Sequence, residues 1–169
     1  MVVEDGTGLS NADAYVSVAD ADIYHASYNG STDWSGATTA AKEMAIMVAT
    51  QYIDNTYGSA WKGTRTGSVQ SLDWPRAGVQ DQNGFVQASD ELPNKLKQAA
   101  AEVALRHVQG DDIMVDIDEP GTISEETLKA GPVSTTVKYA GGMGQVVQFS
   151  IVDALLQHFI GRAGKLVRS

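Results

Sequence analysis

The hydrophobic pattern is most regular between Leu92 and Val108, where apolar side chains recur every three or four residues. This spacing places them on one face of an α-helix, and a second apolar row runs beside the first. A helix that is apolar on two sides is surrounded by other elements, so the pattern predicts the central helix of the fold. Pro93 suits the first turn of this helix, because its missing N–H would have no partner there, and Gly110 marks the end.

Two helical patterns precede the central helix. One predicts a short helix from Val18 to Tyr28 with Ser17 as its N-cap, and the other a longer helix from Thr39 to about Thr56, capped by Thr38 or Thr39. The linker between them is rich in turn-forming residues and contains Trp34. We interpret this tryptophan as a packing residue between helices, which is the usual role of a large aromatic side chain.

Residues 58–91 show little regular periodicity. A loop of this length in a compact domain is either functional or held in place by its own side chains. The candidate loop anchors are Trp61, Arg65, Trp74, Pro75 and Arg76. We expect the tryptophans to be buried and the arginines to pair with aromatic rings or carboxylates, because the surrounding charge is not basic.

The pattern changes after the central helix. Residues 123–129 and 133–139 alternate and contain β-branched side chains, and Gly131 and Pro132 separate them, so they predict a hairpin or two adjacent strands. Beyond residue 146, apolar side chains at helical spacing predict an amphipathic helix of about three turns. The basic sequence that follows, up to Ser169, is predicted to be a mobile arm for a partner surface.

Together these elements predict a mainly α protein. We expect a helical bundle of three to four helices with a small β-hairpin or strand region near the C-terminus and an extended C-terminal arm. The length of 169 residues fits a single domain, 1–169. Its expected parts are a helical core at 17–110, a long anchored loop at 58–91, an acidic loop at 111–122, a strand region at 123–140, and a C-terminal helix and arm at 146–169.

Charge is distributed unevenly along the chain, whose net charge is −9. Residues 111–126 hold seven acids and no base, whereas residues 127–169 hold five bases and one acid. Proteins that bind nucleic acid on their own usually present a basic stripe that replaces the counterions of the phosphates. The short basic tail is the only such feature here, and acidic walls would repel DNA.

The absence of cysteine excludes disulfides, thiolate catalysis and cysteine-ligated zinc. The start of the sequence lacks the basic and apolar segments of a signal peptide, and no apolar run is long enough to span a membrane. We therefore expect a soluble, intracellular protein with no membrane contact.

The acidic run contains a partial match to a calcium-binding loop. Asp116, Asp118 and Gly121 fit the first, third and sixth positions of such a loop. Pro120 and Thr127 occupy the fifth and twelfth positions, so the bidentate carboxylate is missing. A solvated acidic loop is the better interpretation, and we predict no metal site.

Catalytic motifs are also missing from the sequence. The three histidines, His25, His107 and His158, lie on separate predicted helices and lack the spacing of metal ligands. No serine lies in a nucleophile elbow, and no carboxylate pair stands out from the solvated acids. We predict that the protein has no catalytic residues, needs no cofactor and is not an enzyme.

Five stretches carry a resemblance to a known family. They are VEDGTGLSNADAYVSVADADIYH, ATQYID, WKGTRTGSVQSLDWPRAGV, LPNKLKQAAAEVAL and VDALLQHFIGRAGKLVR. In this order they resemble a family of tailed-bacteriophage proteins that are commonly described as DnaT-like single-stranded DNA-binding proteins. These proteins are similar in organisation to phage head–tail connector, or adaptor, proteins.

The resemblance implies a structural virion protein without catalytic residues. Such an adaptor docks as a ring, usually of twelve copies, on the portal protein and links it to the next neck or tail protein. It would lie in the neck of the virion, and in the host cytoplasm during assembly, and DNA would pass through its channel without specific binding. The resemblance also implies partner contacts in the strand region 132–140 and along the C-terminal segment. The partner-binding candidates in that segment are Val152, Leu155, Leu156, Phe159, Ile160, Arg162, Lys165, Leu166, Val167 and Arg168.

Two other functions remain open at this point. The first is single-stranded DNA binding, in which Trp61 and Trp74 would stack on bases while Arg65 and Arg76 contact phosphates. The second is a monomeric structural or scaffolding domain, which fits the composition but leaves the basic tail without a role. Ring formation, salt-sensitive binding of an oligonucleotide, or neither would separate the three hypotheses.

Overall fold

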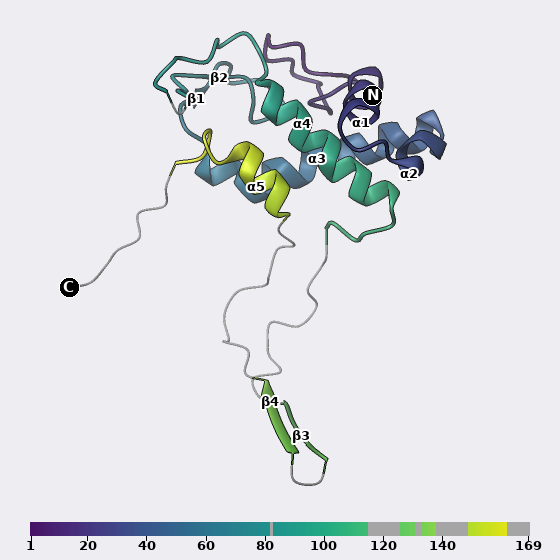
Figure 1. The fold of residues 1–169 in the computed structure, drawn as a ribbon. Coiled ribbons are helices and arrows are strands. Elements are labelled where there is room, and N and C mark those ends of the chain that lie inside the picture. Colours follow the sequence, from purple (N-terminus) through teal and green to yellow (C-terminus); the bar gives the residue numbers. More distant parts are fainter. Residues whose placement is uncertain (82, 115–125, 131–132, 138–148, 162–169) are drawn as a thin grey trace, which may run out of the picture. The chain divides into compact units, whose positions relative to one another are not determined.

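The computed structural model describes all residues except 82, 115–125, 131–132, 138–148 and 162–169. The chain divides into two compact units (Figure 1). Unit 1 contains Met1–Ile113 and Gln148–Ser169, and unit 2 contains Met114–Val147. The expected boundaries of the acidic loop and of the C-terminal helix, at residues 111 and 146, lie close to the two junctions between these units.

Within its described residues, unit 1 contains five α-helices and one short 3₁₀ helix. The three helices that the sequence predicts before residue 110 are all present, with ends that differ by no more than about two residues. The elements are α1 (Val18–Tyr28), α2 (Thr32–Gly36), α3 (Thr39–Tyr57), η1 (Gly58–Ala60), α4 (Asn94–Val108) and α5 (Ser150–Leu156).

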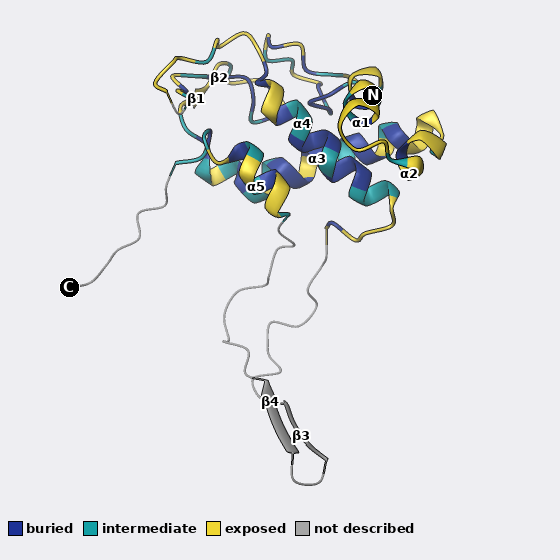
Figure 2. Ribbon diagram, viewed as in Figure 1, coloured by how far each residue is buried: buried dark blue, intermediate teal, exposed yellow. Residues whose placement is uncertain are grey.

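Helix α4 lies at the centre of unit 1, as predicted. It packs along α3 and also contacts α1, α2 and α5. Figure 2 shows its middle turns in the dark blue of buried residues. The buried side chains are Leu96, Ala99, Ala100, Ala101, Val103, Ala104 and Leu105. Because four of the seven are alanines, neighbouring backbones can approach closely. One detail of the prediction is wrong: Pro93 has ψ 135°, so it precedes the helix as its N-cap.

Side-chain caps explain where the first helices begin. Ser17 accepts a hydrogen bond from the backbone of Asp20, and Thr38 accepts one from the backbone of Ala41, so both predicted caps are present. The linker between α1 and α3 forms α2, a single helical turn that the sequence analysis did not predict. Ser31 starts this turn by accepting a hydrogen bond from the backbone N–H of Trp34.

Trp34 is buried, which confirms its interpretation as a packing residue. Its indole N–H donates a 2.7 Å hydrogen bond to Asp22, and its ring lies 4.7 Å from the ring of His25. Lys42 also bonds Asp22 at 2.9 Å and lies over the face of the Trp34 ring. These contacts join α1, α2 and the start of α3.

The N-terminal lead-in is extended, as predicted, and is closed by a bridge between Val3 and Ala14. The buried carboxylate of Glu4 organises it by accepting hydrogen bonds from the backbone of Gly6, Gly8 and Leu9 at 2.8–2.9 Å. A side chain in place of hydrogen at Gly6, which has φ +104°, would meet a backbone carbonyl at 2.0 Å. The turn therefore requires glycine at this position.

Unit 2 contains the predicted hairpin. Strand β3 (Glu126–Ala130) pairs antiparallel with β4 (Val133–Val137), from Ala130 opposite Val133 to Glu126 opposite Val137. Residues 123–125 and 138–139, which the sequence analysis assigned to the strands, lie outside the described residues. Most of the expected acidic loop does too, although Asp111 and Asp112 are described and are exposed.

Helix α5 is shorter than the predicted three turns. After Leu156 the chain turns, and Ile160 pairs with Trp61 in an isolated antiparallel bridge. The predicted arm from residue 162 onward lies outside the described residues. Among the helices that are described, none has both the length and the apolar character needed to cross a bilayer.

Candidate functional site

The long loop between α3 and α4 holds the five loop anchors. It is fastened by a two-stranded pairing of β1 (Thr64–Arg65) with β2 (Arg76–Ala77), and it contains a cis peptide bond between Trp74 and Pro75. A second short bridge joins Gln80 to Val86. The loop is therefore held down by its own residues, which is one of the two outcomes that its length predicted.

An aromatic cluster forms the centre of this region. The Trp61 ring lies 5.9 Å from Tyr57 and 5.7 Å from Trp74, and Trp74 lies 5.6 Å from Phe159. Trp74 is fully buried and Trp61 is 7% exposed. Three of these rings meet edge to face or nearly so, the arrangement that the charge distribution of an aromatic ring favours. The cluster joins the end of α3, the loop and the residues after α5.

The two arginines of the loop differ in exposure, since Arg76 is buried and Arg65 is exposed. Arg76 is 9% exposed, and its guanidinium donates to the carbonyls of Lys62, Asp73 and Gly63 at 2.8–3.2 Å. Arg65 donates to the carbonyl of Gln70. Each guanidinium therefore satisfies backbone acceptors within the loop. We predicted pairing with rings or carboxylates, and for Arg76 that detail is wrong, since carbonyls are its partners.

This geometry decides what the loop can do chemically. Stacking on a nucleic-acid base requires an accessible aromatic face, and phosphate binding requires a free guanidinium. Neither Trp61 nor Trp74 offers such a face, and Arg76 is occupied by three carbonyls. Four of the five loop anchors are therefore buried packing residues, whereas Arg65 is exposed.

Asp54, a residue that the sequence analysis did not single out, forms a hydrogen bond to the backbone of this loop. Asp54, on α3, accepts a hydrogen bond from the Tyr15 hydroxyl with one oxygen and from the backbone N–H of Asp73 with the other. Burial raises the pKa of Asp54 to about 6. Burial and the neighbouring Asp54 carboxylate raise the pKa of Tyr15 as well. Nothing in the sequence pattern identifies this pair, because its members are 39 residues apart.

The histidines do not form a common site. His25 is buried, and its Nε2 lies 3.1 Å from the carbonyl of Ala101. Burial lowers its pKa, so the neutral ring is favoured. His107 and His158 are partly exposed and lie on different elements. Among the described residues there is no group of three or more histidine, aspartate or glutamate side chains placed to hold a metal ion.

The C-terminal partner-binding candidates fall into three groups. Val152, Leu156 and Phe159 are buried in the core of their own chain. Leu155 and Ile160 are partly buried. The remaining candidates, Arg162, Lys165, Leu166, Val167 and Arg168, lie outside the described residues. A partner would have to displace α5 to reach the first group, so any docking through this segment would use the second and third groups.

Unit 1 also presents a groove that the sequence analysis missed. It has a volume of about 390 Å³ and is formed by α2, the start of α3 and the end of α4. We call it the α2–α4 groove. Its lining residues are Asp33, Gly36, Ala37, Ala41, Met44, His107 and Val108. A sequence pattern does not reveal it, because its walls come from three separate elements.

Comparison with known proteins assigns the family. One family model matches residues 1–169, which is the full length of the sequence. The chain belongs to the family described as "Putative DnaT-like ssDNA binding protein". No curated protein and no solved structure was found to match it. The description of this DnaT-like family mentions DNA binding, whereas the two tryptophans of the loop are buried and present no face to a base.

Proposed function

We propose that the protein is a head–tail adaptor, a structural virion protein that docks as a ring on the portal and links it to the next neck or tail protein. The observation that carries this proposal is the hairpin of unit 2. Among the described residues, β3 and β4 pair only with each other, so each strand has one edge whose backbone groups have no strand partner.

A two-stranded hairpin of this size is at best marginally stable in water. Its unpaired edges are templates for a strand of another chain, and strand addition is a common way for protein subunits to associate. The hairpin lies in the sequence between α4 and α5, which both belong to unit 1. A folded core that carries an incomplete sheet is what a subunit needs if its neighbours complete that sheet in a ring.

The charge of the chain supports the same function. The net charge of −9 and the acidic run at residues 111–126 oppose tight binding of phosphates. A ring with acidic segments around its channel lets DNA pass without holding it. In this proposal the protein acts in the neck of the virion and, during assembly, in the host cytoplasm, and it uses no cofactor and catalyses no reaction.

Single-stranded DNA binding is the second candidate, because the family description names it. Three of the four residues that it would use do not support it, since Trp61, Trp74 and Arg76 are buried inside the chain, and Arg65 alone is exposed. A DNA-binding surface would have to use other aromatic side chains. Tyr28 and Phe85 are the exposed ones among the described residues.

Native mass spectrometry of the protein, alone and mixed with the portal ring of the same phage, tests the proposal. The adaptor function predicts a complex in which a fixed, ring-sized number of copies joins the portal. Fluorescence anisotropy with a labelled oligonucleotide at about 50 and 200 mM salt tests the alternative, because phosphate contacts weaken steeply over this range. Failure to join the portal, combined with salt-sensitive DNA binding, would replace the first proposal with the second.

A further inference from the structure

The α2–α4 groove has an apolar floor and an acidic rim. Ala37, Ala41, Met44 and Val108 supply apolar surface, and Met44 is 58% exposed. Methionine adapts its shape to different partners because it is flexible and polarisable. A floor of this kind suits a short apolar segment of another chain.

One acidic side chain and one histidine, Asp33 and His107, lie among the lining residues. Asp33 lines the groove, and Gln109 holds one of its oxygens at 3.0 Å, while the other oxygen has no hydrogen-bond partner among the described residues. Asp111 and Asp112, both exposed, follow α4 directly. The groove also lies at the C-terminal end of α4, where the helix dipole favours cations. A suitable occupant is therefore a segment with apolar side chains flanked by positive charge.

The chain contains one such segment, at residues 162–169. Leu166 and Val167 lie between Lys165 and Arg168, and Arg162 adds a third positive charge. No acidic side chain interrupts this segment. We propose that the α2–α4 groove binds residues 162–169 of a neighbouring copy. This inference rests on the proposed function, in which copies lie side by side in a ring.

The distance along α3 explains why the occupant comes from another copy. The backbone N–H of Gly161 donates a 2.7 Å hydrogen bond to Ala60, which fixes the start of the segment just beyond the C-terminal end of α3. The groove lies at the other end of this helix, where Ala41 is about 24 Å from Tyr57 at 1.5 Å per residue. A fully extended chain from Gly161 carries Leu166 only about 18 Å. Even a fully extended chain from Gly161 would therefore not carry Leu166 as far as Ala41 of the same copy.

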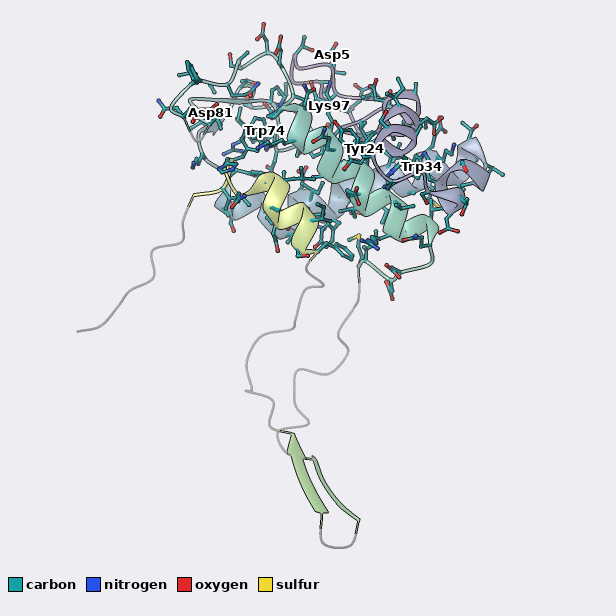
Figure 3. All side chains as sticks on the ribbon, in the orientation of Figure 1. Asp5, Tyr24, Trp34, Trp74, Asp81 and Lys97 are labelled. Atoms are coloured by element: carbon teal, nitrogen blue, oxygen red, sulfur yellow. The ribbon has the colours of Figure 1, made fainter. Side chains whose placement is uncertain are left out.

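Figures 1 and 3 show the two ends that the contact would join. Helix α2 and Trp34 lie at one end of unit 1, and Trp74, with the β1–β2 region, lies at the other. A contact between different surfaces of identical subunits is heterologous, and repeating it produces a ring when the rotation closes. The groove and the tail thus supply the two different surfaces that a ring requires.

Engineered cysteines test this contact cleanly, because the natural sequence has no cysteine. Full-length Met44→Cys is mixed with full-length Leu166→Cys, one of them carrying a mass tag, and treated with a short bis-maleimide cross-linker. The control pair is Val69→Cys with Leu166→Cys, since Val69 is 73% exposed but lies in the loop between β1 and β2. Each cysteine variant is also cross-linked on its own, which measures the yield of dimers joined through the same position in both copies.

We expect the Met44–Leu166 pair to give at least a several-fold higher yield of cross-linked heterodimer than the control pair. The excess should shrink at about 1 M salt, where the Debye length falls to about 3 Å. Arg168→Glu in the Leu166→Cys chain should also reduce the yield of cross-linked heterodimer, because it reverses one of the positive charges of the segment. Equal yields from the two pairs would overturn the inference.

Binding to the portal, measured with the cysteine-free protein, separates this inference from the proposed function. A ring on the portal without the Met44–Leu166 cross-link would refute the groove contact and leave the adaptor function standing. A cross-link without portal binding would refute the adaptor function and retain the contact between copies.

Discussion

The hydroxyl of Tyr15 donates a hydrogen bond to Oδ1 of Asp54, and this partly buried contact joins the N-terminal lead-in to α3. The same hydroxyl oxygen accepts a 3.3 Å hydrogen bond from the backbone N–H of Trp74. Oδ2 of Asp54 accepts another from the backbone of Asp73 at 3.2 Å. Three segments that are distant in sequence therefore converge on one tyrosine and one carboxylate.

The raised pKa of Asp54 predicts how stability changes with pH. Its pKa in the folded chain is about 6, compared with 3.8 for an unperturbed aspartate, so the folded state holds this proton more tightly than the unfolded state does. The contribution of Asp54 to stability is present below pH 4 and is lost as pH rises to 6 and above. At 1.36 kcal/mol per pKa unit, the loss is at most about 3 kcal/mol.

Urea unfolding of the wild type and of Asp54→Asn, followed by tryptophan fluorescence between pH 4 and pH 7.5, measures this effect. The variant should lack the decline that Asp54 causes between pH 4 and pH 6. Asp90→Asn is the matched control, because it neutralises an exposed carboxylate and should leave the profile unchanged. Identical profiles for the wild type and Asp54→Asn would contradict the assignment.

His25 should make the protein less stable as pH falls, which is the opposite of the effect of Asp54. The carbonyl of Ala101 can only accept, so Nε2 of His25 donates to it, and Nδ1 accepts from the Asn29 amide at 3.0 Å. Burial lowers the pKa of His25 below its usual 6.5, so its contribution to stability is present above pH 6.5 and is lost as pH falls. An NMR titration should give His25 a pKa below 6.5, and a value at or above 6.5 would refute this account.

The turn at Gly6 should not tolerate a side chain. In Gly6→Ala the new methyl group would meet the carbonyl oxygen of Asp90 at 2.0 Å, in a backbone conformation with φ +104°. Gly30→Ala is the matched control, because Gly30 also has positive φ, +55°, but has open space around it. We expect Gly6→Ala to be less stable than Gly30→Ala by at least about 2 kcal/mol in urea unfolding. Equal losses would show that the lead-in moves aside at no cost.

Trp74→Ala tests the packing role of the tryptophan loop. Trp74 is fully buried against Trp61 and Phe159, so truncation should cost roughly 3–5 kcal/mol and lower the melting temperature by roughly 10 °C. Trp74→Phe keeps an aromatic ring in the cluster and should lose less. Differential scanning calorimetry measures both. An unchanged melting temperature together with lost oligonucleotide binding would show that the loop acts in DNA recognition and not in packing.

The sequence predicted the parts of the fold that depend on local periodicity and capping. The apolar rows of α4, the cap at Ser17 and the alternating strands on either side of Gly131 and Pro132 were all recognisable in this way. Helix α2 was missed because a single turn is too short to show a period. It forms because Ser31 caps it and Trp34 anchors it.

The site was harder to predict, because its residues meet only through tertiary contacts. The loop was expected to be anchored by its tryptophans, and it is, yet the carbonyl partners of Arg76 follow from loop geometry that no pattern encodes. Val152 and Phe159 also show that a sequence pattern does not identify the contacts of a residue. Their helical spacing indicated an apolar face, but spacing alone does not say whether that face packs on the chain's own core or on a partner.

Two truncations should separate the core function of the C-terminal segment from its partner function. Ending the chain after Gly161 keeps Phe159, the bridge between Ile160 and Trp61, and the hydrogen bond from Gly161 to Ala60. Ending it after Gln157 removes all of these contacts, including the buried Phe159 ring, whose loss alone should cost roughly 3–5 kcal/mol.

We therefore expect the chain that ends at Gly161 to melt within a few degrees of the full-length protein, and the chain that ends at Gln157 to melt substantially lower. Native mass spectrometry with the portal should then show fewer bound copies for the chain that ends at Gly161, because the positive segment that would link neighbours is gone. If its melting temperature falls as far as that of the shorter chain, residues 162–169 stabilise their own core. Normal stability with impaired ring assembly would place their action between copies.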